Sequence, residues 1–265
     1  MKAYAVRTTN QTTCHLRTRH AVWVVVRTAY LTALAGCVQP AGHAHNDYLH
    51  PRPLLDALAA GFASVEADVF LVDGELRVGH ERDELVPGTL ESLYLEPLRR
   101  RVRAGGGSFA LLVDIKAEGA AVYAALRPVL ARYREILTSF RDDGVEERAV
   151  RVILSGDRPI AMVRAERERL CAIDGRPEDL ESDPSPFLVP WISESWSKLF
   201  GRGTVELDAA QRARLQRLVD LAHGQGRLVR LWGAPDTEST WAVQRDAGVD
   251  RINTDRLAAF ARWSR

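Results

Sequence analysis

Short apolar segments alternate with longer amphipathic segments along the chain from residue 41 onwards. The short segments have the length of β-strands, and the longer ones repeat apolar residues at the spacing of a helix. Strands are predicted at residues 41–45, 63–71, 109–116, 150–155, 169–173, 187–192, 227–232 and 249–253. Helices are predicted at residues 53–61, 89–104, 119–137, 159–168, 208–226 and 238–248. Strands mostly separated by helices in this number predict an α/β fold, the (β/α)8 TIM barrel.

Two stretches interrupt this regular alternation. Residues 75–80, ELRVGH, are predicted to form an extra short strand after a turn at Asp73–Gly74. Residues 174–190 are rich in Pro, Asp and Glu and are predicted to form a loop. A doubly wound open sheet is the alternative architecture, and the number and even spacing of the strands favour the barrel.

The composition is that of an ordinary globular protein, with 46% hydrophobic and 27% charged residues. The 36 basic and 35 acidic residues nearly cancel, and no basic run is interleaved with aromatic residues, so nucleic acid is not an expected partner. Cysteines at positions 14, 37 and 171 match neither a zinc spacing nor a disulfide framework. From the pattern of strands and helices, residues 38–265 are predicted to form one barrel domain. Cys171 is predicted to be a small buried residue of that domain.

Residues 1–37 have the features of a targeting leader. Basic residues precede an apolar stretch that ends in small residues, which is typical of a secretory signal. The tetrapeptide LAGC at residues 34–37 is similar to a bacterial lipobox. It predicts a lipidated Cys37, a membrane tether and an extracytoplasmic protein, either secreted or membrane-anchored. The alternative is an uncleaved extension; a membrane span is not expected, because the apolar run is short and contains Arg27.

Ionisable residues gather in the first half of the chain, at strand-like positions. They are His45, Glu66, Asp68, His80, Asp114 and Lys116. A buried charge is costly unless it is paired with an opposite charge or bound to a metal. In a TIM barrel the C-terminal ends of the strands meet at one rim, where the reactive groups lie. We therefore expect these residues to form one shared site.

The three carboxylates predict a metal site. Glu66 and Asp68 lie two residues apart on a strand and so share a face, and Asp114 lies near the end of the next strand. Carboxylates this close repel one another unless a cation neutralises them. A set of oxygen ligands without cysteine suits Mg²⁺, with Ca²⁺ as the second choice. The alternative is a salt-bridged barrel interior, in which Lys116 or a nearby arginine supplies the counter-charge.

Two histidines and a lysine complete the candidate chemistry. His45 and His80 are the candidate acid–base pair, because histidine titrates near neutral pH. His43 lies on the same strand face, and His45 is preferred because it lies nearer the end of the strand. Lys116, one of 3 lysines beside 33 arginines, is a candidate phosphate ligand. The alternative for each histidine is a structural role in the core or at the rim.

The combination resembles the phospholipase-C-like phosphodiesterase superfamily, which includes glycerophosphodiester phosphodiesterases and the venom type of sphingomyelinase D. The family pattern matches in order. It has a histidine at the end of the first strand, Glu-x-Asp in the second strand, a histidine shortly after it, and a carboxylate-x-Lys pair in the third strand. RLWGAPD places Trp232 where the family has an aromatic residue, although a barrel-closing role is the alternative. Within the superfamily the closest likeness is to the altered-inheritance-of-mitochondria protein 6 group, through HNDY, SVEADVFL, LRVGH and SLYLEPL.

The resemblance implies a barrel of the phospholipase-C-like phosphodiesterase type over residues 41–260. It implies that Glu66, Asp68 and Asp114 hold the metal, that the two histidines transfer protons, and that Lys116, Asn46 and Trp232 contact the substrate. Glycerophosphodiesterases usually have His-Arg-Gly at the first strand. Asn46 replaces that arginine here and would offer a phosphate hydrogen bonds but no charge.

The implied activity is hydrolysis, or cyclisation with release of an alcohol, of a phosphodiester. The expected substrate is a phospholipid headgroup or a small phosphodiester. One alternative is a catalytically inactive barrel that binds a phosphorylated ligand or an envelope component. Another is a different barrel hydrolase, such as a metal-dependent enzyme that processes sugars.

Overall fold

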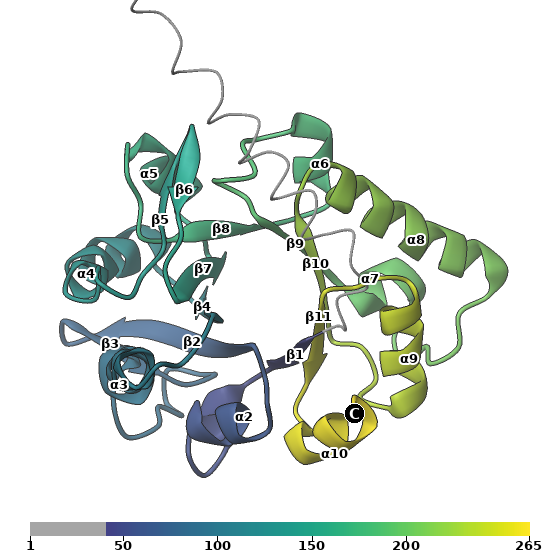
Figure 1. Ribbon diagram of the computed structural model, residues 1–265, viewed down its shortest axis with the longest axis horizontal. Helices are drawn as coiled ribbons and strands as arrows, with labels where there is room; N and C mark the ends of the chain where they lie inside the picture. The colour runs from purple at the N-terminus through teal and green to yellow at the C-terminus, as the bar shows by residue number, and fades with distance from the viewer. Residues whose placement is uncertain (1–40) are drawn as a thin grey trace, which may run out of the picture. The chain divides into compact units, whose positions relative to one another are not determined.

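Eight parallel strands close into a barrel surrounded by helices in the computed structural model, which describes residues 41–265 (Figure 1). They are β1 (Ala41–Ala44), β2 (Ser64–Val72), β4 (Phe109–Ile115), β7 (Val150–Gly156), β8 (Ala172–Gly175), β9 (Trp191–Ser195), β10 (Leu228–Trp232) and β11 (Arg251–Thr254). Neighbours in this order pair in parallel, and β1 also pairs with β11, which closes the sheet. The predicted TIM barrel is confirmed, and the open sheet is excluded.

Short helical turns and longer helices connect the strands. They are η1 (Asp47–Leu49), α2 (Leu55–Ala59), η2 (Glu91–Leu95), α3 (Glu96–Arg103), α4 (Gly119–Ala131), α5 (Ile160–Ala165), α6 (Glu178–Ser182), α7 (Trp196–Phe200), α8 (Ala209–Gly224), α9 (Glu238–Asp246) and α10 (Leu257–Trp263). The longest, α8, begins where the sequence predicts. Asp208 accepts a hydrogen bond from the Gln211 backbone N–H at 2.8 Å, and the Gln211 side chain accepts one from the Asp208 backbone N–H, so the helix starts with a capping box.

The barrel interior changes from apolar to polar along four adjacent strands. The side chains of Leu112, Ile153, Ala172 and Trp191 are buried together inside it. Two residues later on the same strands stand Asp114, Ser155, Asp174 and Ser193. Because residues two apart on a strand share a face, this polar set also points inward, one layer nearer the C-terminal ends. An apolar floor therefore supports a polar layer at the rim that carries the reactive groups of TIM barrels.

Two hairpins lie outside the barrel. The extra strand β3 (Glu75–Val78) pairs antiparallel with the end of β2, as predicted. Asp73 and Gly74 make the turn, both with positive φ (51° and 81°), which explains why Asp-Gly is suited to it. A second hairpin, β5 (Ser139–Arg141) with β6 (Gly144–Glu146), was not predicted.

The structure corrects the positions of two strands and one loop. β8 begins at Ala172 rather than at residue 169, because Arg169 instead bridges to Phe140 of the β5 strand. β9 begins at Trp191 rather than at residue 187, because residues 186–188 form a turn. The segment 174–190, predicted to be a loop, contains the end of β8 and helix α6.

Among residues 41–265, no helix has the length and apolarity needed to cross a bilayer. The predicted leader at residues 1–37 and its lipobox cysteine, Cys37, lie outside the described residues. The third cysteine, Cys171, is buried as predicted.

Candidate active site

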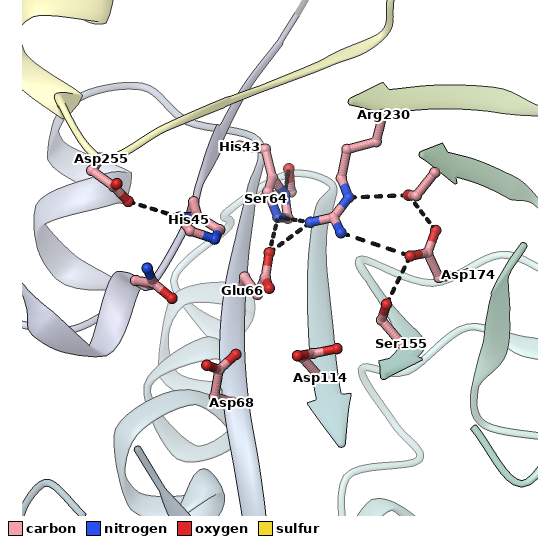
Figure 2. Close-up of polar contacts among 12 residues, drawn as sticks. His43, His45, Ser64, Glu66, Asp68, Asp114, Ser155, Asp174, Arg230 and Asp255 are labelled. Carbon is pink, nitrogen blue, oxygen red and sulfur yellow. Dashed lines mark hydrogen bonds and ion pairs between the residues drawn. The ribbon is translucent and has the colours of Figure 1, made fainter. Parts of the chain in front are cut away.

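The three predicted carboxylates come together near the C-terminal end of β4 and in the first part of β2, which continues beyond them into the hairpin with β3 (Figure 2). Asp68 and Asp114 are register partners on the two strands, and Glu66 precedes Asp68 on the same face of β2. Each of the three offers an oxygen, and these oxygens lie within 4.8 Å of one another. The barrel thus brings together the acidic set that the sequence predicts.

Asp68 is the centre of this cluster. Its side chain is fully buried, and its Oδ2 accepts a hydrogen bond from the Tyr48 hydroxyl at 2.8 Å. The same oxygen lies 2.8 Å from Lys116 Nζ and 3.0 Å from His80 Nδ1. Its other oxygen, Oδ1, is buried with no hydrogen-bond partner among residues 41–265. A buried carboxylate oxygen without a donor is rare and suits a group that receives a ligand.

Lys116 lies between the two carboxylates rather than apart from them. Its Nζ is 2.9 Å from Asp114 Oδ2 as well as 2.8 Å from Asp68. Burial lowers the pKa of Lys116, but Asp114 and Asp68 raise it by more than burial lowers it. The pKa therefore lies above its ordinary value, and the ammonium stays charged. Burial and the charge of Glu66 raise the pKa of Asp114 above its ordinary value. This carboxyl therefore needs positive charge nearby to stay ionised.

Glu66 pairs with an arginine from the opposite side of the barrel, Arg230 on β10. Arg230 Nη1 lies 2.6 Å from Glu66 Oε2, and both side chains are almost completely buried. Burial raises the pKa of Glu66, but Arg230 and a hydrogen bond with His43 outweigh it and hold this pKa well below the usual range. Arg230 was not predicted to belong to the site, although a charge inside the apolar strand RLVRLW is a signal of it.

His43 is a buried structural histidine. Its ring nitrogens face Ser64 Oγ at 2.8 Å and Glu66 Oε2 at 3.3 Å, and Arg230 lies 3.1 Å away. Burial lowers its pKa to about 4, so the ring is neutral at physiological pH. These contacts occupy both nitrogens, which favours His45 over His43 for proton transfer.

A hydrogen-bonded network continues from Arg230 across the barrel (Figure 2). Arg230 Nε donates to Ser193 Oγ at 3.1 Å, and Ser193 in turn donates to Asp174 Oδ1 at 2.5 Å. Ser155 donates to Asp174 Oδ2 at 2.9 Å. Neither Ser155, Asp174 nor Ser193 was predicted to contribute to the site.

Both candidate catalytic histidines are held by a carboxylate through Nδ1. His45 Nδ1 lies 2.9 Å from Asp255 Oδ1, and His80, on the loop after β3, lies 3.0 Å from Asp68. Burial lowers the pKa of His45, yet the hydrogen bond with Asp255 and the charge of Glu66 raise it above the ordinary value overall. A carboxylate on Nδ1 fixes the ring and leaves Nε2 for a reacting group. Figure 2 shows the His45 ring between Asp255 and Glu66.

Asn46 and Trp232 stand at the rim, outside the carboxylate cluster. Asn46 is in the left-handed conformation (φ 46°), and its Oδ1 lies 3.1 Å from the Tyr48 hydroxyl. Trp232, at the end of β10, is 40% exposed. Such exposure is inconsistent with a packed, barrel-closing aromatic, and it leaves the ring free to contact a substrate. Their predicted contacts with a phosphate stay predictions.

The cluster fits a hard divalent cation. Its donors are three carboxylates without thiolate, and Asp68 Oδ1 has no other partner among the described residues. Lys116 and Arg230 also supply the counter-charge that a salt-bridged interior would have. An ion would share the carboxylates with these two cations, because Glu66 and Asp114 each keep a second oxygen.

Two family models match segments that carry part of the site. Residues 32–104 match the AIM6-like phosphodiesterase domain, and residues 229–258 match the glycerophosphoryl diester phosphodiesterase family. The first match contains His45, Glu66, Asp68 and His80, and the second contains Arg230, Trp232 and Asp255.

Curated relatives extend the likeness over most of the chain. The altered inheritance of mitochondria protein 6 homolog of Arthroderma benhamiae is 27% identical over 82% of this chain and 81% of its own length. Altered inheritance of mitochondria protein 6 of Eremothecium gossypii is 28% identical over 83% of this chain and 68% of its own length. A glycerophosphodiester phosphodiesterase from Agrobacterium tumefaciens matches the structure with a TM-score of 0.51 at 15% identity, over 84% and 98% of the two chains. This last likeness shows the fold.

These relatives correct one prediction. The expected extracytoplasmic location, as a secreted or membrane-anchored lipoprotein, is wrong, because the names of these two curated relatives refer to mitochondria. The resemblance predicted from the sequence, to the phospholipase-C-like phosphodiesterases and among them to the altered-inheritance-of-mitochondria protein 6 group, is confirmed.

Proposed function

We propose that the protein is a metal-dependent phosphoric diester hydrolase that acts on a small phosphodiester or a phospholipid headgroup. One observation carries the proposal: two histidines, each held by a carboxylate through Nδ1, flank a cluster of three carboxylates at one rim. The match to two phosphodiesterase family models supports the same class of reaction.

The two histidines divide the proton transfers. Its raised pKa makes His45 the protonated partner, which donates from Nε2 to the departing alcohol oxygen. His80 accepts the proton of the attacking hydroxyl, and Asp68 stabilises the imidazolium that forms. Attack by water gives direct hydrolysis. Attack by a neighbouring hydroxyl of the substrate gives a cyclic phosphate.

The remaining groups bind and orient the diester. Lys116, held between Asp68 and Asp114, places a positive charge where a phosphate oxygen would bind. Glu66, Asp68 and Asp114 would hold a divalent ion, Mg²⁺ in preference to Ca²⁺, which would polarise the phosphate and offset its developing charge. Asn46 and Trp232 lie at the rim to contact the arms of the substrate.

The test is turnover of a panel of phosphodiesters by the full chain with Mg²⁺, with Ca²⁺ and with EDTA. His45→Ala and His80→Ala are each expected to lower turnover by about 10²- to 10⁴-fold. His223→Ala is the matched control, because His223 also pairs with a carboxylate, Asp250, but lies on α8 away from the rim. Mass spectrometry of the products separates hydrolysis from cyclisation. Full turnover in either rim variant would refute the proposed roles.

A barrel that binds a phosphorylated ligand without cleaving it is the second candidate. It is favoured by the two cations, Lys116 and Arg230, that neutralise the carboxylates without any metal. In that case the protein would bind inorganic phosphate with the same affinity in EDTA and in Mg²⁺. No member of the panel would then be consumed.

A further inference from the structure

Two arginines meet at the ends of neighbouring strands, on the side of Asp114 away from Asp68. Arg158 follows β7, and Arg176 follows β8. Both donate from Nη1 to the main-chain oxygen of Asp174, so their guanidinium groups converge on one acceptor. Like charges held this close repel one another unless an anion lies between them. The pair is therefore a candidate for binding an anion.

The loop that carries Arg158 is fixed against the carboxylate cluster. The backbone N–H of Asp157 donates to the Ile115 carbonyl at 2.7 Å. Gly156 has a φ of +70°, and a Cβ at this position would lie 2.7 Å from Asp114 Oδ1. The backbone before Arg158 therefore passes directly over Asp114, and only glycine allows this approach. As a result, Arg158 is presented beside the candidate site in a fixed position.

Among the described residues, Arg158 has no direct ion pair of the kind that the neighbouring cations have. Arg176 Nη1 lies 3.1 Å from Asp174 Oδ2, Lys116 lies within 2.9 Å of two carboxylates, and Arg230 lies 2.6 Å from Glu66. Arg158 makes no ion pair with a carboxylate within residues 41–265, and its Nε is buried without a hydrogen bond.

Holding this charge is costly for the free protein. Burial and the neighbouring Arg176 lower the pKa of Arg158 by more than the charges of Asp174, Asp179 and Asp114 raise it. A half-buried cation without a direct ion pair is less stable than a paired one, and an incoming anion would relieve that cost. Because Arg158 lies at the rim, we expect its ionic partner to be a ligand rather than another side chain.

We propose that Arg158 and Arg176 bind a second anionic group of the substrate, beside the phosphodiester that is cleaved. Guanidinium groups match the paired oxygens of carboxylates and phosphates. The inference rests on the proposed function and narrows the substrate to diesters with one arm that ends in an oxyanion. That oxyanion is a phosphate monoester or a carboxylate.

Three glycerophosphodiesters that differ only in the second arm test the proposal. The arm is glycerol, glycerate or glycerol phosphate, which gives a neutral, a carboxylate and a phosphate end. The full chain with Mg²⁺ is expected to have a higher kcat/KM for an anionic arm than for the neutral arm. Arg158→Gln and Arg176→Gln are each expected to reduce this preference about tenfold. The anionic arm with the larger loss identifies the oxyanion.

Two further variants separate charge from geometry and from general damage. Arg158→Lys keeps the charge but loses the planar fork, so an intermediate loss of preference is expected. Arg217→Gln, on the exposed face of α8, is the matched control and should keep the wild-type preference. Equal kcat/KM values for the three substrates in the wild type would overturn the proposal. So would a wild-type preference in both rim variants.

Anion binding without turnover separates this proposal from the proposed function. Inorganic phosphate is titrated into the full chain in EDTA by calorimetry. At least tenfold weaker binding by Arg158→Gln and Arg176→Gln, with wild-type binding by Arg217→Gln, supports the anion site even if no diester is cleaved. Cleavage of diesters with no effect of either rim variant on preference or phosphate binding overturns the anion site alone.

Discussion

The polar layer of the barrel has two halves with opposite properties. In one half, here called the closed half, Arg230, Ser193, Asp174 and Ser155 are buried, and both oxygens of Asp174 accept hydrogen bonds. In the other, the open half, Asp68 keeps a buried oxygen without a partner and His80 is 56% exposed. Both halves contain charged residues on otherwise apolar strands. Within residues 41–265, only the open half has polar side-chain atoms that are free to contact a ligand.

The closed half has a structural role, and the open half contains the groups that are proposed to react. Buried polar groups with all their hydrogen bonds made stabilise one conformation, whereas unsatisfied groups are typical of functional sites. Glu66 joins the halves, because Arg230 binds its Oε2 and its carboxylate is also part of the cluster with Asp68 and Asp114. We infer that the closed half fixes Glu66 in place for the open half. Substitutions in the closed half should therefore lower stability first, and those in the open half should lower turnover first.

The largest effect is expected for Arg230→Met in the closed half. It leaves Glu66 and Asp174 buried without their shared cation, and breaking a buried pair in this way costs about 3–5 kcal/mol. Chemical denaturation measures the loss in the free energy of unfolding. Arg245→Met, at an exposed arginine of α9, is the control and should change it by less than about 0.5 kcal/mol. Equal unfolding free energies for the two variants would contradict the assignment of Arg230 to a supporting network.

Asp68→Asn should have the largest effect in the open half. The amide keeps the shape but removes the charge at the centre of the cluster, so we expect turnover to fall about 10³-fold. Metal affinity, measured by calorimetry with Mg²⁺, should fall with it. The free energy of unfolding should fall less than in Arg230→Met, because the amide oxygen can keep the contacts of Oδ2, the NH2 replaces Oδ1, which has no partner within residues 41–265, and Lys116 still pairs with Asp114. A stability loss as large as that of Arg230→Met would remove the distinction between the halves.

The open half could be predicted from the sequence, and the closed half could not. Glu66, Asp68 and Asp114 were found because two-residue alternation and strand ends are local features of the sequence. Asp174 was missed because the strand that carries it was placed three residues too early. Residue 169 belongs to the same apolar run, but it pairs with the β5–β6 hairpin, which no local pattern predicted.

Partners distant in the sequence were also missed. Asp255, 210 residues after His45, and Arg230, 164 residues after Glu66, reach the site only because β10 and β11 close the barrel against β1. A charge within an apolar strand indicates that a partner exists. It does not indicate which strand supplies the partner, because that depends on closure and register.

Asp255→Asn tests whether the Asp255 carboxylate raises the pKa of His45. The expected loss of turnover is smaller than that of Asp68→Asn. The raised pKa of His45 depends in part on Asp255, so the amide should lower this pKa. A proton donor is active in its protonated form, and turnover is lost as the pH rises through its pKa. The basic limb of the pH–rate profile should therefore move to lower pH, with about a tenfold loss of turnover above neutral pH. An unshifted limb with a uniform loss would indicate a purely structural role.

The smallest effects come from a matched pair of hydroxyl deletions, one in each half. Ser155→Ala removes a donor to Asp174, and Tyr48→Phe removes a donor to Asp68. Each lost hydrogen bond should cost about 1 kcal/mol. In the closed half this cost should appear in the free energy of unfolding, with turnover unchanged, because Arg176 still holds Asp174 Oδ2. In the open half it should appear as about a fivefold fall in turnover, because the ring of Tyr48 still fills its place and only the orientation of Asp68 is relaxed. If both variants lose only stability, or both lose only turnover, Asp68 and Asp174 have the same role. The partnerless oxygen of Asp68 would then not distinguish the reactive half of the layer.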